Sequence, residues 1–315
     1  MRCRRAWLSF AVPVSLSLGL SASATGQDAP AGFSVKFKEE VTPFPLLAMF
    51  VLPGRRVTLE IEPKNPDRWY SAQAFEGALE QLASDRWQWT APERSGLYPV
   101  LLRDAVSSET VTLNAFVMLP APAGPTLNGF RIGRYERRPL RGDSAYRKPT
   151  GFVEVTEANR GTLVSPHLSL GQFVSKQPGG YPKYLVLRER LLLKLELLLA
   201  EAQKAGMRVT TFRIMSAYRT PFYNRLIGNE TRYSRHVYGD AADIYVDEDG
   251  DGIMDDLDGD GRVTLDDARA LAGVVDSLRG RSPSLEGGLG LYDATPAHGP
   301  FVHVDTRGRR VRWGP

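Results

Sequence analysis

The segment AADIYV, residues 241–246, alternates between two kinds of side chain with the two-residue period of a β-strand. One face of that strand would be wholly apolar, and the opposite face would carry Asp243. A buried carboxylate is costly unless it has a hydrogen-bonding partner, an opposite charge or a metal ion. The segment therefore constrains the fold strongly, because it predicts a strand within a sheet and a partner for Asp243.

The segment FVHVD, residues 301–305, shows the same alternation near the end of the chain. Phe301, His303 and Asp305 would share one face of this second strand. Two strands of one sheet could thus direct Asp243 and His303 toward one point. The pattern predicts a site that is shared by two strands far apart in the sequence.

A third ligand is available from His236, which stands just before a turn at Gly239. Two histidines and one carboxylate form the protein ligand set of a catalytic zinc site, in which the fourth position stays open for water. A structural zinc site would usually close with cysteines. The only cysteine, Cys3, lies in a predicted signal peptide, so the mature chain would have none. The residues therefore favour catalytic zinc at His236, Asp243 and His303.

The sequence around these ligands resembles the zinc D-Ala-D-Ala carboxypeptidase family. The family motif Ser-x-His-x-x-Gly-x-Ala-x-Asp is matched by Ser234, His236, Gly239, Ala241 and Asp243. The upstream motif Ser-x-Tyr-Arg-Ser/Thr is matched by Ser216, Tyr218, Arg219 and Thr220. The segment SPHLSLGQF, residues 165–173, is similar to the entry segment of the phage-like branch of the family. The resemblance extends from about Ser165 to Trp313.

By this resemblance, His236, Asp243 and His303 bind zinc in an α+β peptidase domain with an antiparallel sheet and helices. Arg219 would polarise the scissile carbonyl or hold a carboxylate of the substrate, because a fixed guanidinium stabilises developing negative charge. The implied reaction is hydrolysis of a peptide bond in a peptidoglycan stem peptide by zinc-activated water. Carboxypeptidase and endopeptidase activity both stay open, as do D,D- and L,D-specificity.

The general base is not fixed by the motif. Many relatives place an acidic base three residues before the last zinc histidine, where this chain has Pro300. His298 stands five residues before His303, where some carboxypeptidases of the family keep a catalytic histidine. Asp305 could serve instead, or it could orient His303. The spacing favours His298 as the proton shuttle, because a histidine exchanges protons near neutral pH.

An acidic insertion separates the two predicted strands, with ten Asp and Glu residues between positions 247 and 267. The segment DLDGDGRVTLDD, residues 256–267, matches the ligand spacing of a calcium loop, with Gly261 at the sharp turn. It resembles dockerin loops, and the repeat just before it resembles thrombospondin-type calcium repeats. The predicted calcium ligands are Asp247, Asp249, Asp251, Asp256, Asp258, Asp260, the carbonyl of Arg262, Thr264 and Asp267. We expect one or two structural calcium ions, followed by a helix over residues 268–278.

The first 24 residues predict a signal peptide for export. Arg2, Arg4 and Arg5 precede an apolar run that is too short to span a bilayer, and small residues follow it. Loss of these three charges would lower the formal net charge from +4 to +1. The mature protein is therefore expected in the periplasm or secreted to the cell envelope, with no membrane span.

Three further segments follow the signal peptide. Residues 30–120 contain short alternating strands separated by turn residues, which predict a small all-β sandwich that resembles the immunoglobulin-like modules of bacterial surface proteins. Residues 121–160 begin with a proline-rich stretch and are predicted as a linker, and residues 161–315 are predicted as the zinc domain. Within that domain, the leucine-rich segment 181–206 predicts a core helix that begins at Pro182.

These features favour an exported zinc metallopeptidase whose partners are peptidoglycan stem peptides. One alternative keeps zinc without strong catalysis, as a cell-wall-binding module, and Pro300 favours it slightly. Another alternative is a calcium-dependent adhesion protein, which fails to explain the spacing of the His, Asp and Arg residues. No arginine-aromatic run indicates nucleic acid, which an exported protein would rarely meet. The sequence does not indicate which proteins bind this chain.

Overall fold

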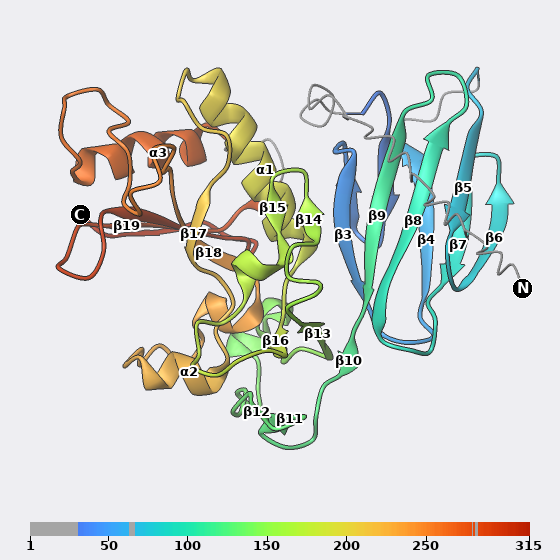
Figure 1. Cartoon of the computed structure of the whole chain (residues 1–315), viewed down its shortest axis with the longest axis horizontal. Helices are drawn as coiled ribbons and strands as arrows, with labels where there is room; N and C mark the ends of the chain where they lie inside the picture. Colours follow the sequence, from blue (N-terminus) through green and yellow to red (C-terminus); the bar gives the residue numbers. More distant parts are fainter. Residues whose placement is uncertain (1–30, 63–66, 279, 281–282) are drawn as a thin grey trace, which may run out of the picture.

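The computed structural model describes residues 31–62, 67–278, 280 and 283–315 of the chain (Figure 1). The predicted signal peptide, residues 1–24, lies outside the described residues. Two parts lie side by side in Figure 1, one built from strands alone and one that contains the α-helices. Within the described ranges, no helix is both long enough and apolar enough to cross a membrane.

The strand-only part forms two sheets. Its strands are β1 (Ser34–Phe37), β2 (Glu40–Thr42), β3 (Leu46–Val51), β4 (Arg56–Glu62), β5 (Tyr70–Ala74), β6 (Ala78–Ala83), β7 (Arg86–Thr90), β8 (Gly96–Asp104) and β9 (Thr110–Val117). One sheet has the order β2-β1-β4-β7-β6 and the other has the order β3-β9-β8-β5. Neighbouring strands are antiparallel except for the parallel pair β3 and β9.

These strands form where apolar and polar residues alternate. In β4, Val57, Leu59 and Ile61 are buried, and the residues between them are exposed or half-buried. The two sheets therefore agree with the all-β character that the sequence predicts for this part. The immunoglobulin-like assignment of these sheets remains a prediction.

The predicted linker contains several short elements. They are β11 (Thr126–Leu127), β12 (Phe130–Arg131), η1 (Leu140–Gly142), η2 (Ser144–Tyr146) and β13 (Gly151–Val155), and β10 (Leu119–Pro120) lies just before the linker. β13 pairs with β10 on one side and with β16 (Lys183–Leu185) on the other. Tyr146 is buried, and its ring centroid lies 5.6 Å from that of Tyr238. Much of this segment thus packs against the helix-containing part.

The leucine-rich segment forms helix α1 (Glu189–Lys204), which is shorter than the predicted helix 181–206. The predicted start at Pro182 is wrong, because the next three residues form β16 and hydrogen-bond to β13. The predicted end is confirmed, because the helix ends just before Gly206, whose φ of 84° is favoured by glycine. Leu191, Leu195 and Leu198 of α1 are buried, as expected for a core helix, and Leu187 just before the helix is also buried.

The helix-containing part is built around a five-stranded sheet with the order β17-β18-β20-β19-β21. Its remaining elements are β14 (Leu163–Ser165), β15 (Leu168–Ser169), η3 (Leu170–Phe173), β17 (Arg213–Ser216), α2 (Pro221–Leu226), η4 (Arg235–Tyr238), β18 (Ala241–Tyr245), α3 (Leu265–Ser277), η5 (Pro283–Leu285), β19 (Gly288–Tyr292), β20 (Phe301–Asp305) and β21 (Val311–Trp313). Figure 1 shows α1 and α3 above this sheet and α2 below it. The mostly antiparallel sheet with helices is compatible with the predicted α+β peptidase domain, and α3 confirms a helix after the acidic insertion.

Hydrogen bonds connect the two parts. The carboxylate of Glu189, the first residue of α1, accepts from the backbone N–H of Phe50 at 2.9 Å and from Lys38 Nζ. Asn114 Nδ2 donates to the carbonyl of Leu163 at 2.9 Å. Buried apolar residues from both parts also belong to one connected core. The strand-only part therefore supports α1, the helix that lies beside the central sheet.

Candidate metal centre

Strands β18 and β20 place two of the predicted ligands side by side. The two strands are antiparallel, and Asp243 is the direct partner of His303 in their register. Directly opposed residues point to the same face of a sheet, with their β-carbons close together. Ala242 and Ile244, on the opposite face of β18, are fully buried. The predicted alternation and the shared position of Asp243 and His303 are therefore confirmed.

The third predicted ligand, His236, lies on η4 just before β18. η4 is followed directly by Gly239, which has a φ of 73°. A β-carbon at this position would lie 2.3 Å from the carbonyl oxygen of Val186. Only glycine therefore fits this close backbone approach, and the resulting turn brings His236 back over the strand that carries Asp243.

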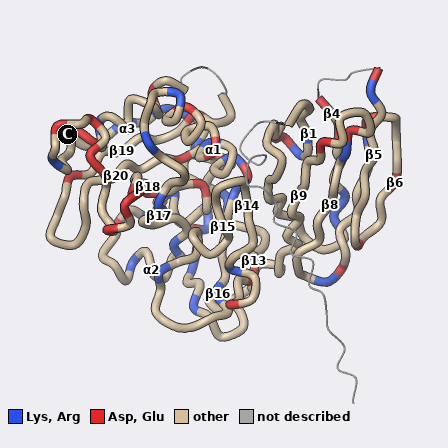
Figure 2. Tube along the Cα trace, turned by 45° about the horizontal axis from the view of Figure 1, so that its top comes forward, with Lys and Arg blue, Asp and Glu red and all other residues tan. Residues whose placement is uncertain are grey.

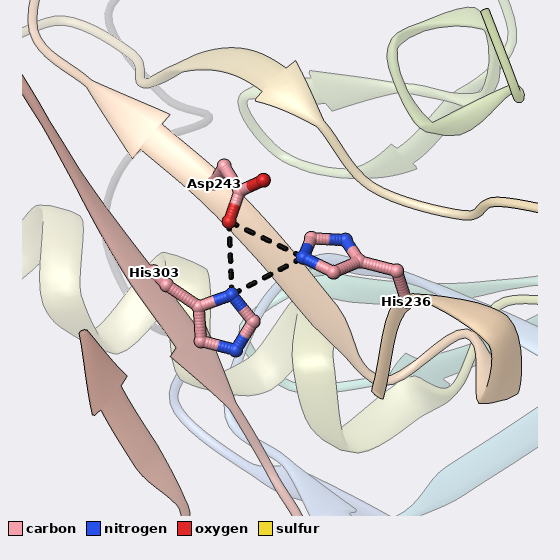
Figure 3. A group of neighbouring side chains, drawn as sticks. All are labelled: His236, Asp243 and His303. Carbon is pink, nitrogen blue, oxygen red and sulfur yellow. Dashed lines mark hydrogen bonds and ion pairs between the residues drawn. The ribbon is translucent and has the colours of Figure 1, made fainter. Parts of the chain in front are cut away.

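The three side chains meet at one point, as Figure 3 shows. His303 Nδ1 lies 2.8 Å from Asp243 Oδ1, and His236 Nε2 lies 3.2 Å from both of these atoms. All three residues are buried. Two imidazole nitrogens and one carboxylate oxygen that face one another in a buried site form a group that could hold a metal ion.

The hydrogen bonds on the far side of each ring fit metal binding. His236 Nδ1 lies 2.7 Å from the carbonyl oxygen of Ala217, which can only accept, so Nδ1 carries the proton and Nε2 presents a lone pair to the centre. His303 Nε2 lies 3.2 Å from Asp305 Oδ2, so donation there leaves Nδ1 free to bind a metal. Each imidazole is thus oriented as a neutral ligand, and the donor set suits zinc.

The charge states of His236 and Asp243 also fit metal binding. Burial lowers the pKa of His236, although Asp243 beside it acts in the opposite direction. Burial alone would raise the pKa of Asp243, but the adjacent imidazoles of His236 and His303 hold it below the ordinary range of a carboxyl group. Burial also opposes a charge on His303, yet hydrogen bonds to Asp243 and Asp305 raise its pKa. A neutral His236 and an ionised Asp243 are the forms that bind metals.

Arg219 contacts the centre through Asp243. Its Nη2 donates to Asp243 Oδ2 at 2.7 Å, and its Nε donates to Ser216 Oγ at 2.8 Å. The first and fourth residues of the Ser-x-Tyr-Arg motif are thereby linked directly. Thr220, the next residue, caps helix α2 by accepting from the N–H of Tyr223. The motif therefore holds the free oxygen of the Asp243 carboxylate, a candidate ligand, and starts the helix that follows.

Asp305 is fully buried, and its oxygens are occupied. They accept from His303 Nε2, from the N–H of Gly288 at 2.8 Å and from Arg307 Nε at 3.0 Å. Burial would raise the pKa of Asp305, but His303 and Arg307 lower it. This geometry favours the orienting role of Asp305 among the two roles that the sequence left open.

His298 is half-buried in the loop before β20. Its Nδ1 lies 2.8 Å from the carbonyl oxygen of Gly299, and its ring meets that of Phe301 edge-on at 5.0 Å between centroids. Both contacts belong to its own stretch of chain, and neither reaches the three candidate ligands. The role of His298 as proton shuttle remains a prediction.

Two residues near the centre were missed by the sequence reasoning. The ring centroid of Trp313 lies 5.0 Å from that of His303, and Trp313 Nε1 donates to the hydroxyl of Tyr292 at 2.9 Å. Lys194 is buried on α1 and donates to the carbonyl oxygen of Asp305 at 2.8 Å, and burial lowers its pKa to about 8. A lysine within a leucine stripe was the signal that could have indicated a buried polar contact.

The acidic insertion forms two groups of carboxylates. Oxygens of the first group lie within 4.8 Å of one another and belong to Asp247, Asp249 and Asp251. The second group meets the same limit and consists of Asp256, Asp258 and Asp267. The predicted ligand Asp260 is not in either group, and its Oδ1 accepts from the N–H of Arg262. The predicted ligand Thr264 caps α3 by accepting from the N–H of Asp266.

Residues 190–255 match the family model of Peptidase M15. The matched stretch contains α1 except its first residue, the Ser-x-Tyr-Arg motif, His236 and Asp243, and it ends before His303. It supports a metallopeptidase of the M15 family, whose members are zinc-dependent. No curated protein matches the chain. The phage-like branch and the dockerin-like character of the insertion remain predictions.

Proposed function

We propose that this chain is an exported, zinc-dependent peptidase that hydrolyses peptide bonds in the stem peptides of peptidoglycan. The observation that carries the proposal is the convergence of His236 Nε2, His303 Nδ1 and Asp243 Oδ1 within 3.2 Å of one another. The M15 match supports the peptidase class and a peptidoglycan substrate. The predicted signal peptide supports export.

The three donor atoms would hold the zinc ion. A zinc ion in such a set activates water for attack and polarises a carbonyl group. The carbonyl of Ala217 and the carboxylate of Asp305 fix the two imidazole rings. Arg219 holds Oδ2 of Asp243, so Oδ1 stays directed at the centre. The site is thus organised before substrate arrives, which lowers the cost of reaching the reactive geometry.

We assign proton transfer to His298. Donation from its Nδ1 to the carbonyl of Gly299 leaves a lone pair on Nε2, and that nitrogen would accept a proton from water or deliver one to the leaving amine. Asp305 suits this role less well, because its oxygens are occupied by His303, Gly288 and Arg307. Its contribution is to orient His303.

The proposal is tested by zinc analysis and by digestion of purified muropeptides, followed by mass spectrometry. His236→Ala and His303→Ala should each lose bound zinc and all cleavage. His167→Ala is the control and should keep both, because His167 bonds to Glu196 and is not a candidate ligand. Release of single amino acids would indicate a carboxypeptidase, and separated crosslinked dimers would indicate an endopeptidase. Stoichiometric zinc in either ligand variant would remove that residue from the set. A zinc-loaded wild type that binds muropeptides but leaves them uncut would support the wall-binding alternative.

The proposal also keeps structural calcium in the loop over residues 256–267. Its support is the ligand spacing in the sequence and the closeness of the Asp256, Asp258 and Asp267 oxygens. A cation that binds only the folded chain stabilises it by mass action. Calcium should therefore raise the melting temperature of the zinc-loaded wild type and have less effect on Asp256→Ala/Asp260→Ala. The absence of any calcium-dependent shift in the wild type would refute this part.

A further inference from the structure

The first group of carboxylates in the insertion, Asp247, Asp249 and Asp251, differs from the second. Acidic residues are red in Figure 2, and red segments lie along the chain beside β18. In both groups, carboxylates accept from backbone N–H groups of their own loop, as Asp249 Oδ1 does from Asp251 at 3.1 Å and Asp267 Oδ1 does from Leu257 at 2.7 Å. The first group contains a buried oxygen for which the described residues offer no hydrogen bond.

That oxygen is Oδ1 of Asp247, which follows β18 almost directly. Asp247 is 7% exposed, and its Oδ2 lies 3.1 Å from Arg213 Nε on the neighbouring strand β17. Its Oδ1 is buried and has no hydrogen-bond partner in the described part of the chain. A buried carboxylate oxygen without a partner is unfavourable, because the loss of its hydration is not offset by a hydrogen bond or an ion. Since Asp249 and Asp251 are its close neighbours, the missing partner is expected to be positively charged.

The charges around Asp247 support a cation. Arg213 is ion-paired to Asp247, whereas Asp249, Asp251 and Asp255 add three more carboxylates to this loop. Burial, together with the charges of Asp249 and Asp247, raises the pKa of Asp255. The N–H of Asp255 donates to the carbonyl of Val246 at 2.9 Å, so the loop closes directly onto the end of β18. The carboxylates are therefore held together despite their repulsion.

We propose that Asp247, Asp249 and Asp251 form a calcium site of their own, separate from the downstream loop and from the candidate zinc centre. Carboxylate oxygens are hard ligands that calcium prefers, whereas zinc prefers the nitrogen-containing set at His236. The sequence left open whether the insertion takes one ion or two. The unpartnered oxygen of Asp247 points to an ion at this upstream position.

This calcium site would also fix the loop that carries His298, a consequence that rests on the proposed function. Asp251 Oδ1 accepts from the N–H of Ile253 at 2.9 Å. The Cβ of Ile253 lies 3.1 Å from the place that a β-carbon on Gly299 would occupy, so the two residues are in close contact. The carbonyl of Gly299 is in turn 2.8 Å from His298 Nδ1. An ion at Asp251 would therefore hold Ile253 against the segment that orients His298.

Calcium titration calorimetry on the zinc-loaded mature chain tests the site. Asp249→Asn/Asp251→Asn removes two exposed carboxylates, and Asp67→Asn/Asp293→Asn is the matched control, because it removes two exposed aspartates outside the acidic insertion. We expect the first variant to lose one equivalent of calcium, or to bind it on the order of 10-fold more weakly, since charge count tunes such sites. The control should bind like the wild type. Calcium stoichiometry and affinity equal to those of the wild type in Asp249→Asn/Asp251→Asn would overturn the proposed site. Asp247→Asn should show the same loss of calcium binding, because the proposal makes its carboxylate a ligand.

Amide hydrogen exchange with and without calcium tests the connection to His298. Calcium should slow exchange at residues 297–303 in the wild type and in Asp256→Asn/Asp258→Asn, but not in Asp249→Asn/Asp251→Asn. Protection that is equal in both double variants would refute the connection. Neither measurement requires cleavage of muropeptides, so a failure here is distinguishable from a failure of the proposed peptidase.

Discussion

Replacement of Asp305 by asparagine tests how the candidate centre holds its ligands. Asp305 Oδ2 accepts from His303 Nε2 at 3.2 Å, on the side of the ring opposite the centre. The residue is fully buried and also binds Gly288 and Arg307. Asparagine keeps the shape of the side chain but removes the charge that makes the imidazole of His303 a stronger ligand.

The expected loss can be estimated from these contacts. Removal of a partner that orients a metal-binding histidine costs about 10–100-fold in metal affinity, which corresponds to about 1.4–2.7 kcal/mol. A second loss falls on folding, because the largely buried guanidinium of Arg307 would lose its carboxylate. Breaking a buried ion pair from one side costs about 3–5 kcal/mol. Asp305→Asn should therefore weaken zinc binding and lower the free energy of unfolding.

Asp240→Asn is the matched control that separates the two effects. Asp240 is also buried and pairs with the buried Arg235, but none of its side-chain contacts involves the three candidate ligands. Zinc affinity would be measured by competition with a chelator at fixed pH, and stability by urea unfolding of the same samples. Both variants should be destabilised, and only Asp305→Asn should bind zinc more weakly. Wild-type zinc affinity in a folded Asp305→Asn, or equal losses in both variants, would refute the orienting role.

Three further predictions concern single side chains. Arg219→Lys should lose most turnover while zinc is retained, because the lysine ammonium cannot bond to Asp243 and Ser216 together as the planar guanidinium does. Cleavage of muropeptides at the wild-type rate would contradict this prediction. His298→Ala should reduce turnover by about 10²–10⁴-fold with zinc still bound. The rate would be measured by muropeptide release at several pH values, and an unchanged rate would exclude His298 as the proton shuttle. Burial lowers the pKa of Lys194 to about 8 from an ordinary value of 10.5. Between these pH values the unfolded chain holds a proton on Lys194 that the folded chain has lost, so the free energy of unfolding rises with pH. Measured by urea unfolding, the stability of the wild type relative to Lys194→Met should therefore rise from pH 8 to 10.5. A stability difference that does not change with pH would contradict the lowered pKa.

The sequence by itself determined the strands that carry Asp243 and His303, two of the candidate ligands, and the faces on which they lie. The alternation in residues 241–246 and 301–305 is local, because side chains on a strand point to opposite faces with a period of two. The turn at Gly239 was also visible, since few other residues adopt its backbone conformation without strain. These local rules were sufficient to bring His236, Asp243 and His303 together as a hypothesis, and the geometry agrees with it.

Tertiary structure alone decided the contacts that join distant segments. Leu185 is in a strand rather than in the helix that its leucine-rich neighbours predict. Its backbone pairs with β13, and local propensity cannot anticipate this pairing with a distant segment. Arg219 binds Asp243 rather than facing outward, and the Ala217 carbonyl sets the tautomer of His236. The unpartnered oxygen of Asp247 is likewise a property of packing. Spacing in the sequence indicates which groups are available, but burial and long-range hydrogen bonds decide which group each one meets and which is left for an ion.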